Sequence, residues 1–300
     1  MRLLLGCLAL CAWAQDATFT TGVKLVTVLA SVRDRDGHVV TNLTRDDFTL
    51  IEDGRPQTVR YFSQESDLPL KIGLLVDTSW SQKSVLKPER EASYKFLDQV
   101  LREDRDSAFV LHFDSRIGLL QGFTSSREKL AVALDQLEIP KRPSTLLYDA
   151  VKQASEELMH AEAGRKAFIV LSDGVDVRSA NNIETAIEFA QRADTIVYSI
   201  VFASHTAFDP LGIAIHEAYL AGGRKAMHRL AGETGGDYFV VRRGLSIEKI
   251  YDQIEDELRH QYSLAYTSDQ ADTSGKYRKI VLTANRKGLV VRTRDGYYPK

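Results

Sequence analysis

Three oxygen-bearing side chains stand at alternate positions directly after an apolar stretch of the sequence. The apolar residues 70–76 are followed by Asp77, Ser79 and Ser81. Alternate residues of an extended segment point to the same side, so one carboxylate and two hydroxyls can face one point. Hard divalent cations such as Mg²⁺ prefer about six oxygen ligands of this kind. The spacing therefore indicates a cation site, and the alternative is that Ser81 or Ser84 caps the following helix.

Two further segments carry side chains of the same type. Thr145 stands in the loop before an expected helix at 147–161, and Asp173 ends another apolar strand. In an open α/β sheet, ligands bind outside the carboxyl ends of the strands, so both residues are expected near Asp77. The alternative for Asp173 and Gly174 is a plain turn.

Each of these five residues has an expected role toward Mg²⁺, Mn²⁺ or Ca²⁺. Ser79 and Ser81 coordinate through their hydroxyls, and Thr145 adds a third hydroxyl, directly or through water. Asp77 and Asp173 mainly hold ligands and waters in place. Direct ligands that are largely neutral leave the cation with much of its charge and one open position. Such a position attracts a carboxylate from another protein.

Other acidic residues near these segments have simpler interpretations. Asp149 is expected to complement the dipole at the start of a helix. Asp176 is expected in a solvated loop, with the outer shell of the cation as the alternative. Asp34 and Asp36 have part of the spacing of a calcium loop but lack its first and last ligands, so they predict a hairpin turn.

Strands and helices alternate from residue 68 to 260, which predicts a doubly wound, mostly parallel α/β sheet. Near-continuous apolar strands are typical of such a sheet when helices cover both faces. One short antiparallel edge strand is expected at 118–124, and 203–222 is expected to be part loop and part short helix. The expected strands are 71–76, 107–113, 167–171, 195–202 and 237–241. The expected helices are 84–102, 126–137, 147–161, 182–193, 223–234 and 246–260.

The sequences on either side of this region have β patterns. Four strands are expected within 15–67 and three within 261–300. Neither set can bury a core alone, so we expect one joint seven-stranded sandwich with the α/β region inserted between its halves. Two small sheets that dock separately are the alternative.

Composition and the N-terminus indicate an exported globular protein. The 300 residues carry 39 basic and 41 acidic side chains, a net charge of -2, which does not point to nucleic acid. Residues 1–14 have the order of features of a signal peptide, and we expect a periplasmic, extracellular or cell-surface location. Both cysteines, Cys7 and Cys11, lie in this leader. No later apolar run is long enough for a transmembrane segment.

The three site segments, in this order, resemble the von Willebrand factor type A (vWA) domain and its metal-ion-dependent adhesion site. The resemblance covers 68–260 and implies a Rossmann-like fold. The flanking patterns V-x-V-x-D-x-x-G-x-x-V-x-x-L-T-x-x-D-F and Q-Y-x-L-x-Y, with D-G-Y-Y near the end, resemble the VWFA-related acidobacterial-type family of exported bacterial proteins. The resemblance also implies that, in some relatives, cation occupancy is coupled to movement of the last helix, which is 246–260 in this sequence.

This interpretation of the sequence predicts a cation-dependent adhesion or protein-interaction module rather than an enzyme. Its partner would be a protein that offers a carboxylate to the cation. Trp80 departs from the small residue usual between the two serines, and it is expected either at a partner-binding rim or as a lid on its own domain. The alternatives are a structural or assembly protein without metal use and, least favoured, a metal-assisted hydrolase.

Overall fold

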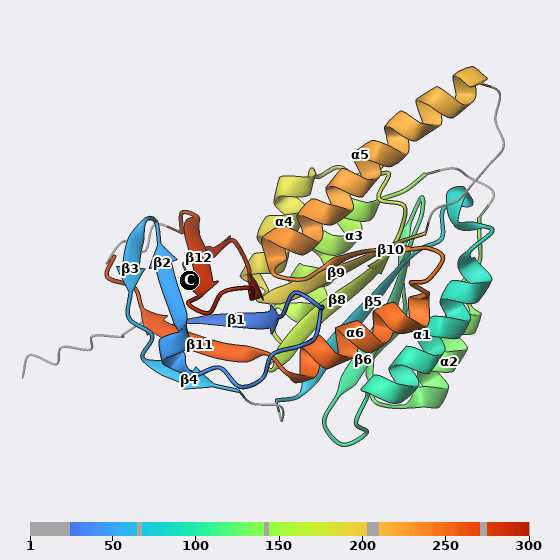
Figure 1. The fold of residues 1–300 in the computed structure, drawn as a ribbon. Helices are drawn as coiled ribbons and strands as arrows, with labels where there is room; N and C mark the ends of the chain where they lie inside the picture. Colours follow the sequence, from blue (N-terminus) through green and yellow to red (C-terminus); the bar gives the residue numbers. More distant parts are fainter. Residues whose placement is uncertain (1–24, 65–67, 141–143, 203–209, 271–274, 300) are drawn as a thin grey trace, which may run out of the picture.

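The computed structural model describes residues 25–64, 68–140, 144–202, 210–270 and 275–299. The expected signal peptide at 1–14 lies outside the described residues. Figure 1 shows an α/β part with a central sheet and, beside it, a smaller part built from strands. Among the described residues, no helix combines the length and the hydropathy needed to cross a bilayer.

The central sheet has six strands in the order β10-β9-β8-β5-β6-β7. All neighbours pair in parallel except β6 and β7, which are antiparallel. The predictions of a doubly wound, mostly parallel sheet and of an antiparallel edge strand are therefore confirmed. The strands are β5 (Leu70–Asp77), β6 (Ser107–Phe113), β7 (Ile117–Thr124), β8 (Arg165–Leu171), β9 (Thr195–Phe202) and β10 (Tyr238–Val241).

Helices cover both faces of this sheet (Figure 1). Buried side chains of α1, α2 and α6 share one core with one face of the sheet, and those of α3, α4 and α5 share a second core with the other face. A short π-helix, η3 (Ala154–Met159), continues α3. The helices are α1 (Leu86–Val100), α2 (Arg127–Asp135), α3 (Leu147–Gln153), α4 (Ile183–Arg192), α5 (Pro210–Thr234) and α6 (Ile247–Arg259).

Helix α5 differs from the sequence prediction. The prediction that a helix begins at Gly223 is wrong, because α5 already begins at Pro210. The pair Gly222-Gly223 suggests a helix boundary, since each glycine costs a helix interior about 1 kcal/mol relative to alanine. A Cβ on Gly223 would lie 2.4 Å from the carbonyl oxygen of Asp173. This glycine is therefore required by the close approach of α5 to the loop after β8.

The remaining strands form a β-sandwich of two four-stranded sheets, ordered β13-β1-β11-β4 and β14-β12-β2-β3. Each sheet contains strands from before and after the α/β part, and their buried side chains form one cluster. The prediction of one joint sandwich is confirmed, but with eight strands rather than seven. The strands are β1 (Leu25–Arg33), β2 (Phe48–Glu52), β3 (Arg55–Gln57), β4 (Tyr61–Ser63), β11 (Tyr262–Thr267), β12 (Arg278–Ala284), β13 (Val290–Arg292) and β14 (Gly296–Tyr297).

Buried ionic contacts join α6 to both parts of the molecule. Arg165, at the start of β8, donates from Nη1 to the carbonyl oxygen of Leu258 at 2.8 Å. This bond satisfies a carbonyl at the end of α6, where a positive charge is favoured. The fully buried Glu257 accepts from Arg33 Nε at 2.5 Å and from Arg292 Nη1 at 3.0 Å. The two arginines belong to β1 and β13, so these ion pairs fix the sandwich to α6.

Replacing Glu257 with alanine is expected to destabilise the protein by about 3 kcal/mol, because two poorly exposed arginines lose a buried partner. Chemical unfolding of both the variant and the wild type measures this difference. Asp252→Ala, an exposed position on the same helix, is the control and is expected to stay within about 0.5 kcal/mol. Equal effects of the two substitutions would contradict the importance of this contact.

Candidate metal centre

The carboxylate of Asp77 is held in place from both sides. Asp77 ends β5, which lies between β8 and β6 in the sheet. Ser172 Oγ donates to Asp77 Oδ2 at 2.6 Å, and the backbone N–H of Ser79 donates to Asp77 Oδ1 at 2.8 Å. The side chain of Asp77 is fully buried. Its two hydrogen bonds join the loop after β5 to the loop after β8, at the edge where the sequence predicts the site.

Thr78 anchors the same loop to the neighbouring strand β6. Its backbone N–H donates to the carbonyl oxygen of Phe113 at 2.9 Å. Its hydroxyl donates to Asp114 Oδ2 at 2.9 Å and lies 3.2 Å from His112 Nδ1. Sequence reasoning missed Thr78 and Asp114. The spacing could have indicated a different role for Thr78. It stands between Asp77 and Ser79, and successive residues of an extended segment point to opposite sides.

The hydroxyls of Ser79 and Ser81 come together, with 3.1 Å between the two Oγ atoms. Neither hydroxyl caps a helix: Ser79 precedes the 3₁₀ turn η2 (Trp80–Gln82) without a side-chain cap bond, and the residue that precedes α1 is Val85. The alternative that Ser81 or Ser84 caps the following helix is therefore wrong. Gln82 Nε2 donates to Ser81 Oγ at 3.1 Å and fixes the position of this hydroxyl.

Thr145 and Asp173 lie on two loops that bond to each other. The backbone N–H groups of Val177 and Arg178 donate to the carbonyl oxygen of Thr145 at 3.1 and 3.3 Å. Asp173 Oδ1 accepts from the N–H of Val175 at 3.0 Å, which is the turn interaction considered as its alternative role. Thr145 and Asp173 are both buried. The three predicted segments thus meet through backbone and side-chain hydrogen bonds.

Asp149 and Asp176 serve the loop after β8 and the start of α3. Asp176 Oδ2 accepts from the backbone N–H of Tyr148 at 3.1 Å, so Asp176 satisfies a free donor in the first turn of α3. Asp149 Oδ1 accepts from the backbone N–H of Asn181 at 3.0 Å and from its side-chain amide at 2.7 Å. Both aspartates therefore fix the loop after β8 to the start of α3, which directly follows the loop that carries Thr145.

The site concentrates buried negative charge. Loss of hydration is the main cause that raises the pKa of Asp77 to about 7, and the nearby charge of Asp173 raises it further. The hydrogen bonds from Ser172 and Ser79 act in the opposite direction. In the described part of the chain, no Lys or Arg forms an ion pair with Asp77 or Asp173. A bound cation would supply the missing positive charge.

Unsatisfied polar atoms next to these loops fit a hydrated cation. Gln82 Oε1, both carboxyl oxygens of Glu89 and Ser144 Oγ are buried and lack a hydrogen-bond partner among the described residues. Buried polar groups in proteins almost always have a protein, water or ion partner. Hard divalent cations bind oxygen ligands and keep several waters, which matches a site of hydroxyls, carboxylates and free acceptors. The residues present therefore fit such a cation.

Trp80 lies beside the paired hydroxyls and is 54% exposed. Lys83 Nζ lies 4.5 Å from the centroid of its ring, a cation–π contact on the surface. More than half of the tryptophan is in contact with solvent, so a partner can reach its ring.

A second cluster of possible ligands has a local structural explanation. Asp34, Asp36 and His38 lie close enough together to hold a metal ion. However, Asp34 Oδ1 accepts from the backbone N–H groups of Asp36 and His38, both at 2.9 Å. These bonds are typical of an aspartate that closes a turn, as the sequence predicts.

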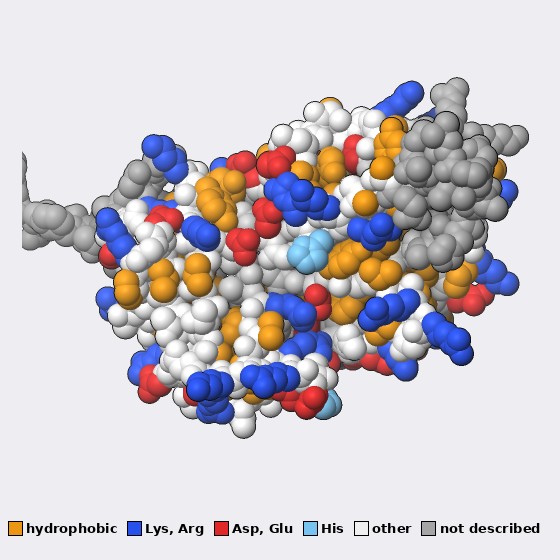
Figure 2. Space-filling model, turned by 45° about the horizontal axis from the view of Figure 1, so that its top comes forward, with side chains coloured by type: hydrophobic (Ala, Val, Ile, Leu, Met, Phe, Trp, Pro, Cys, Tyr) orange, Lys and Arg blue, Asp and Glu red, His pale blue; other side chains and the backbone are white. Residues whose placement is uncertain are grey.

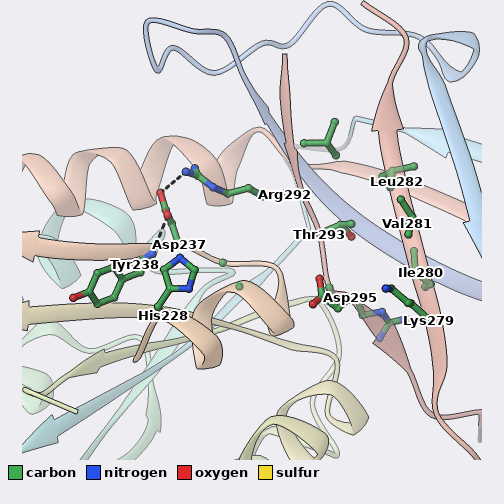
Figure 3. Close-up of a pocket in the computed structure, with 14 residues that line it drawn as sticks. His228, Asp237, Tyr238, Lys279, Ile280, Val281, Leu282, Arg292, Thr293 and Asp295 are labelled. Atoms are coloured by element: carbon green, nitrogen blue, oxygen red, sulfur yellow. Dashed lines mark hydrogen bonds and ion pairs between the residues drawn. The ribbon is translucent and has the colours of Figure 1, made fainter. Parts of the chain in front are cut away.

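A pocket of about 490 Å³ lies where α5 and β10 meet the sandwich (Figure 3). Charged groups in it pair with each other: Arg292 Nη2 lies 2.8 Å from Asp237 Oδ2, and Arg292 also bonds Glu257. Acidic and basic side chains are interspersed over the face shown in Figure 2. The pocket therefore provides weaker evidence for a ligand than the loop that carries Asp77.

Comparison with solved structures supports the fold. Proximal thread matrix protein 1 from the mussel byssus, solved with a zinc-occupied MIDAS motif, is 14% identical with a TM-score of 0.52, over 69% of this chain and 50% of that chain. Its second crystal form gives 13% identity and a TM-score of 0.52, over 69% of this chain and 49% of the other. This chain thus spans about half the length of the mussel protein.

A bacterial structure is also similar: the vWF domain of the type V pili tip protein Mfa5 from Porphyromonas gingivalis is 13% identical with a TM-score of 0.48, over 63% of this chain and 94% of that chain. No curated protein matches the sequence. The family model of the von Willebrand factor type A domain matches residues 72–253, which is more than half of the chain. The chain therefore belongs to the von Willebrand factor type A domain family.

Proposed function

We propose that this protein binds a divalent cation, Mg²⁺ in the first place, at the loop that carries Asp77 and uses it to bind another protein. The observation that carries this proposal is the pair of Ser79 and Ser81 hydroxyls, which lie 3.1 Å apart and cap no helix. They stand beside buried carboxylates that have no basic partner in the described residues. Thr145 and Asp173 complete the proposed set of ligands.

The neutral hydroxyls and the exposed tryptophan determine what kind of partner fits. A cation held there supplies positive charge and an open position for a carboxylate. Trp80 offers an aromatic surface next to that position, and aromatic residues are common anchors of protein interfaces. The partner we propose is therefore a protein that presents a carboxylate beside an apolar side chain.

Location and organisation are part of the same proposal. We propose export by the leader at 1–14 and a periplasmic, extracellular or cell-surface location, where an adhesion module meets its partners. The cation-binding unit is 68–260, between the β segments 15–67 and 261–300. The vWA fold of the mussel protein, solved with zinc in its MIDAS motif, is consistent with cation use in this fold.

The two alternatives from the sequence make different demands on the site. A structural or assembly protein without metal use would have to keep the buried carboxyl groups protonated or without a counter-charge. A metal-assisted hydrolase needs a general base. Nδ1 of the nearby His112 lies 3.2 Å from Thr78 Oγ1 and 3.4 Å from Asp114 Oδ2. Its Nε2 packs so closely on Gly118 that a Cβ there would lie 2.3 Å away, so both ring nitrogens already lie against protein atoms. Both observations favour the binding function.

Isothermal titration with Mg²⁺ and Mn²⁺ tests the proposal. The wild type is expected to bind either cation, and Asp77→Ala is expected to lower the affinity at least about 10-fold, because it removes the group that orients the ligands. Asp36→Ala, in the second acidic cluster, is the control and is expected to bind as the wild type does. A folded wild type that binds neither cation would overturn the proposal and favour the metal-free alternative.

Fluorescence locates the cation relative to Trp80. The sequence has two tryptophans, and Trp13 lies in the proposed leader at 1–14, so the protein from residue 15 onward has Trp80 as its single emitter. Paramagnetic Mn²⁺ is expected to quench its emission, and excess Mg²⁺ is expected to restore it by competition for the same ligands. The quench should disappear when Ser79→Ala and Ser81→Ala are combined. Its persistence in that double variant would place the cation elsewhere.

The raised pKa of Asp77 predicts how stability changes with pH in the metal-free protein. The folded protein keeps a proton on Asp77 up to about pH 7, whereas the unfolded chain releases it near pH 3.8. The stabilisation from this proton is fully present below pH 3.8 and is lost as pH rises to about 7. The loss is about 4 kcal/mol at most.

Thermal unfolding of the wild type and Asp77→Asn between pH 4 and pH 8 measures this effect as the difference between the two proteins. The wild type is expected to lose stability relative to Asp77→Asn as pH rises. Saturating Mn²⁺ is expected to reverse that trend, because the cation competes with the proton. A difference that does not vary with pH would contradict the predicted ionisation of Asp77.

A further inference from the structure

Glu89 is a buried acid with no interaction to explain it. It lies in the first turn of α1 and is 1% exposed. Neither of its carboxyl oxygens has a hydrogen-bond partner in the described residues. Glutamate is rarely fully buried unless it is paired, and a buried carboxylate without a partner is costly. The described residues therefore offer no side chain that compensates this acid.

The electrostatics place Glu89 next to the proposed cation ligands. Burial is the main cause that raises the pKa of Glu89 well above its ordinary value, and the charges of Asp77 and Asp173 raise it further. No basic side chain of the described residues opposes this effect. Three buried carboxyl groups thus act on one another without a counter-charge from the described residues.

The opposite side of Glu89 is closed by α6. Ser93, one turn further along α1 and on the same face, has its hydroxyl 2.8 Å from the hydroxyl of Tyr251. The ring of Tyr251 stacks on Phe96 with 4.4 Å between the centroids. These contacts occupy the space between α1 and α6, and the charged groups that act on Glu89 are Asp77 and Asp173 of the proposed centre.

We infer that Glu89 is a further member of the cation centre, where its carboxylate accepts hydrogen bonds from water that the cation retains. This inference rests on the proposed function and extends it. The centre would then contain three carboxylates instead of two, which favours a divalent over a monovalent cation. Gln82 Oε1, the other free buried acceptor of the same segment, would bind the same water layer.

The rival explanation is that Glu89 is a protonated acid that only fills the core. The two explanations differ in the response to Glu89→Gln, which keeps the size of the side chain and removes its charge. A core-filling acid predicts the same cation affinity after this change. A member of the centre predicts weaker binding, because the charge that favours the cation is lost.

Titration with Mn²⁺ and thermal unfolding of the metal-free protein together test the inference. Glu89→Gln is expected to weaken Mn²⁺ binding by about 10- to 100-fold. It is also expected to raise the melting temperature of the metal-free protein at neutral pH, because folding no longer requires an acid to be protonated or buried with its charge. Glu91→Gln, on the exposed side of the same helix, is the control and is expected to match the wild type in both measurements.

Glu89→Asp keeps the charge and shortens the side chain, and it is expected to retain more Mn²⁺ affinity than Glu89→Gln. It also provides a second test if Glu89→Gln fails to fold. Wild-type affinity in Glu89→Gln, or a loss in Glu89→Asp as large as in Glu89→Gln, would overturn the inference and leave the cation site in place. Absence of Mn²⁺ binding by the wild type would instead overturn the proposed function, and this inference with it.

Discussion

The burial of the Asp77 carboxylate beside Asp173, without a basic partner in the described residues, is the constraint around which the α/β part is arranged. A buried carboxylate is tolerated only when its oxygens are bonded and its charge is compensated. The fold provides the bonds, because Ser172 belongs to the loop after β8, and β8 pairs with β5 along its length. Thr78 fixes the other side to β6. The uncompensated charge is what a cation would neutralise.

The helices on both faces of the sheet complete this arrangement. On one face, α5 approaches so closely that a Cβ on Gly174 would lie 2.3 Å from the carbonyl oxygen of Gly223. The backbone at Gly174 also has a φ of +80°, which favours glycine. A larger residue at either position would push α5 away from the loop that carries Asp173. On the other face, α1 brings Glu89 toward the same point. The position of each acidic group therefore depends on packing between layers rather than on its own strand or helix alone.

Sequence reasoning succeeded where the determining interactions are local. Asp77, Ser79 and Asp173 follow apolar strands, and parallel strands bring their carboxyl ends to one edge, so the sequence was sufficient to predict that these residues share an edge. Their role toward a cation stays a prediction. It failed where contacts between residues distant in the sequence determine the burial of a side chain or the start of a helix. Glu89 lies in the charged run K-P-E-R-E, which has the composition of a solvated surface, yet it is buried in the folded protein. The sequence did not reveal the early start of α5, because Gly223 serves the close approach of α5 to the loop after β8 rather than a helix end.

The contacts of α6 limit how a movement of this helix at the proposed cation centre could be transmitted to the sandwich. Near its middle, Tyr251 bonds Ser93 of α1. At its end, Glu257 pairs with two arginines of the sandwich, and Arg165 bonds the carbonyl oxygen of Leu258. Sliding of α6 along its axis would break these buried ion pairs, and a buried charge that loses its partner is strongly destabilising. The contacts therefore favour motion of α6 and the sandwich as one body over sliding of α6 past it.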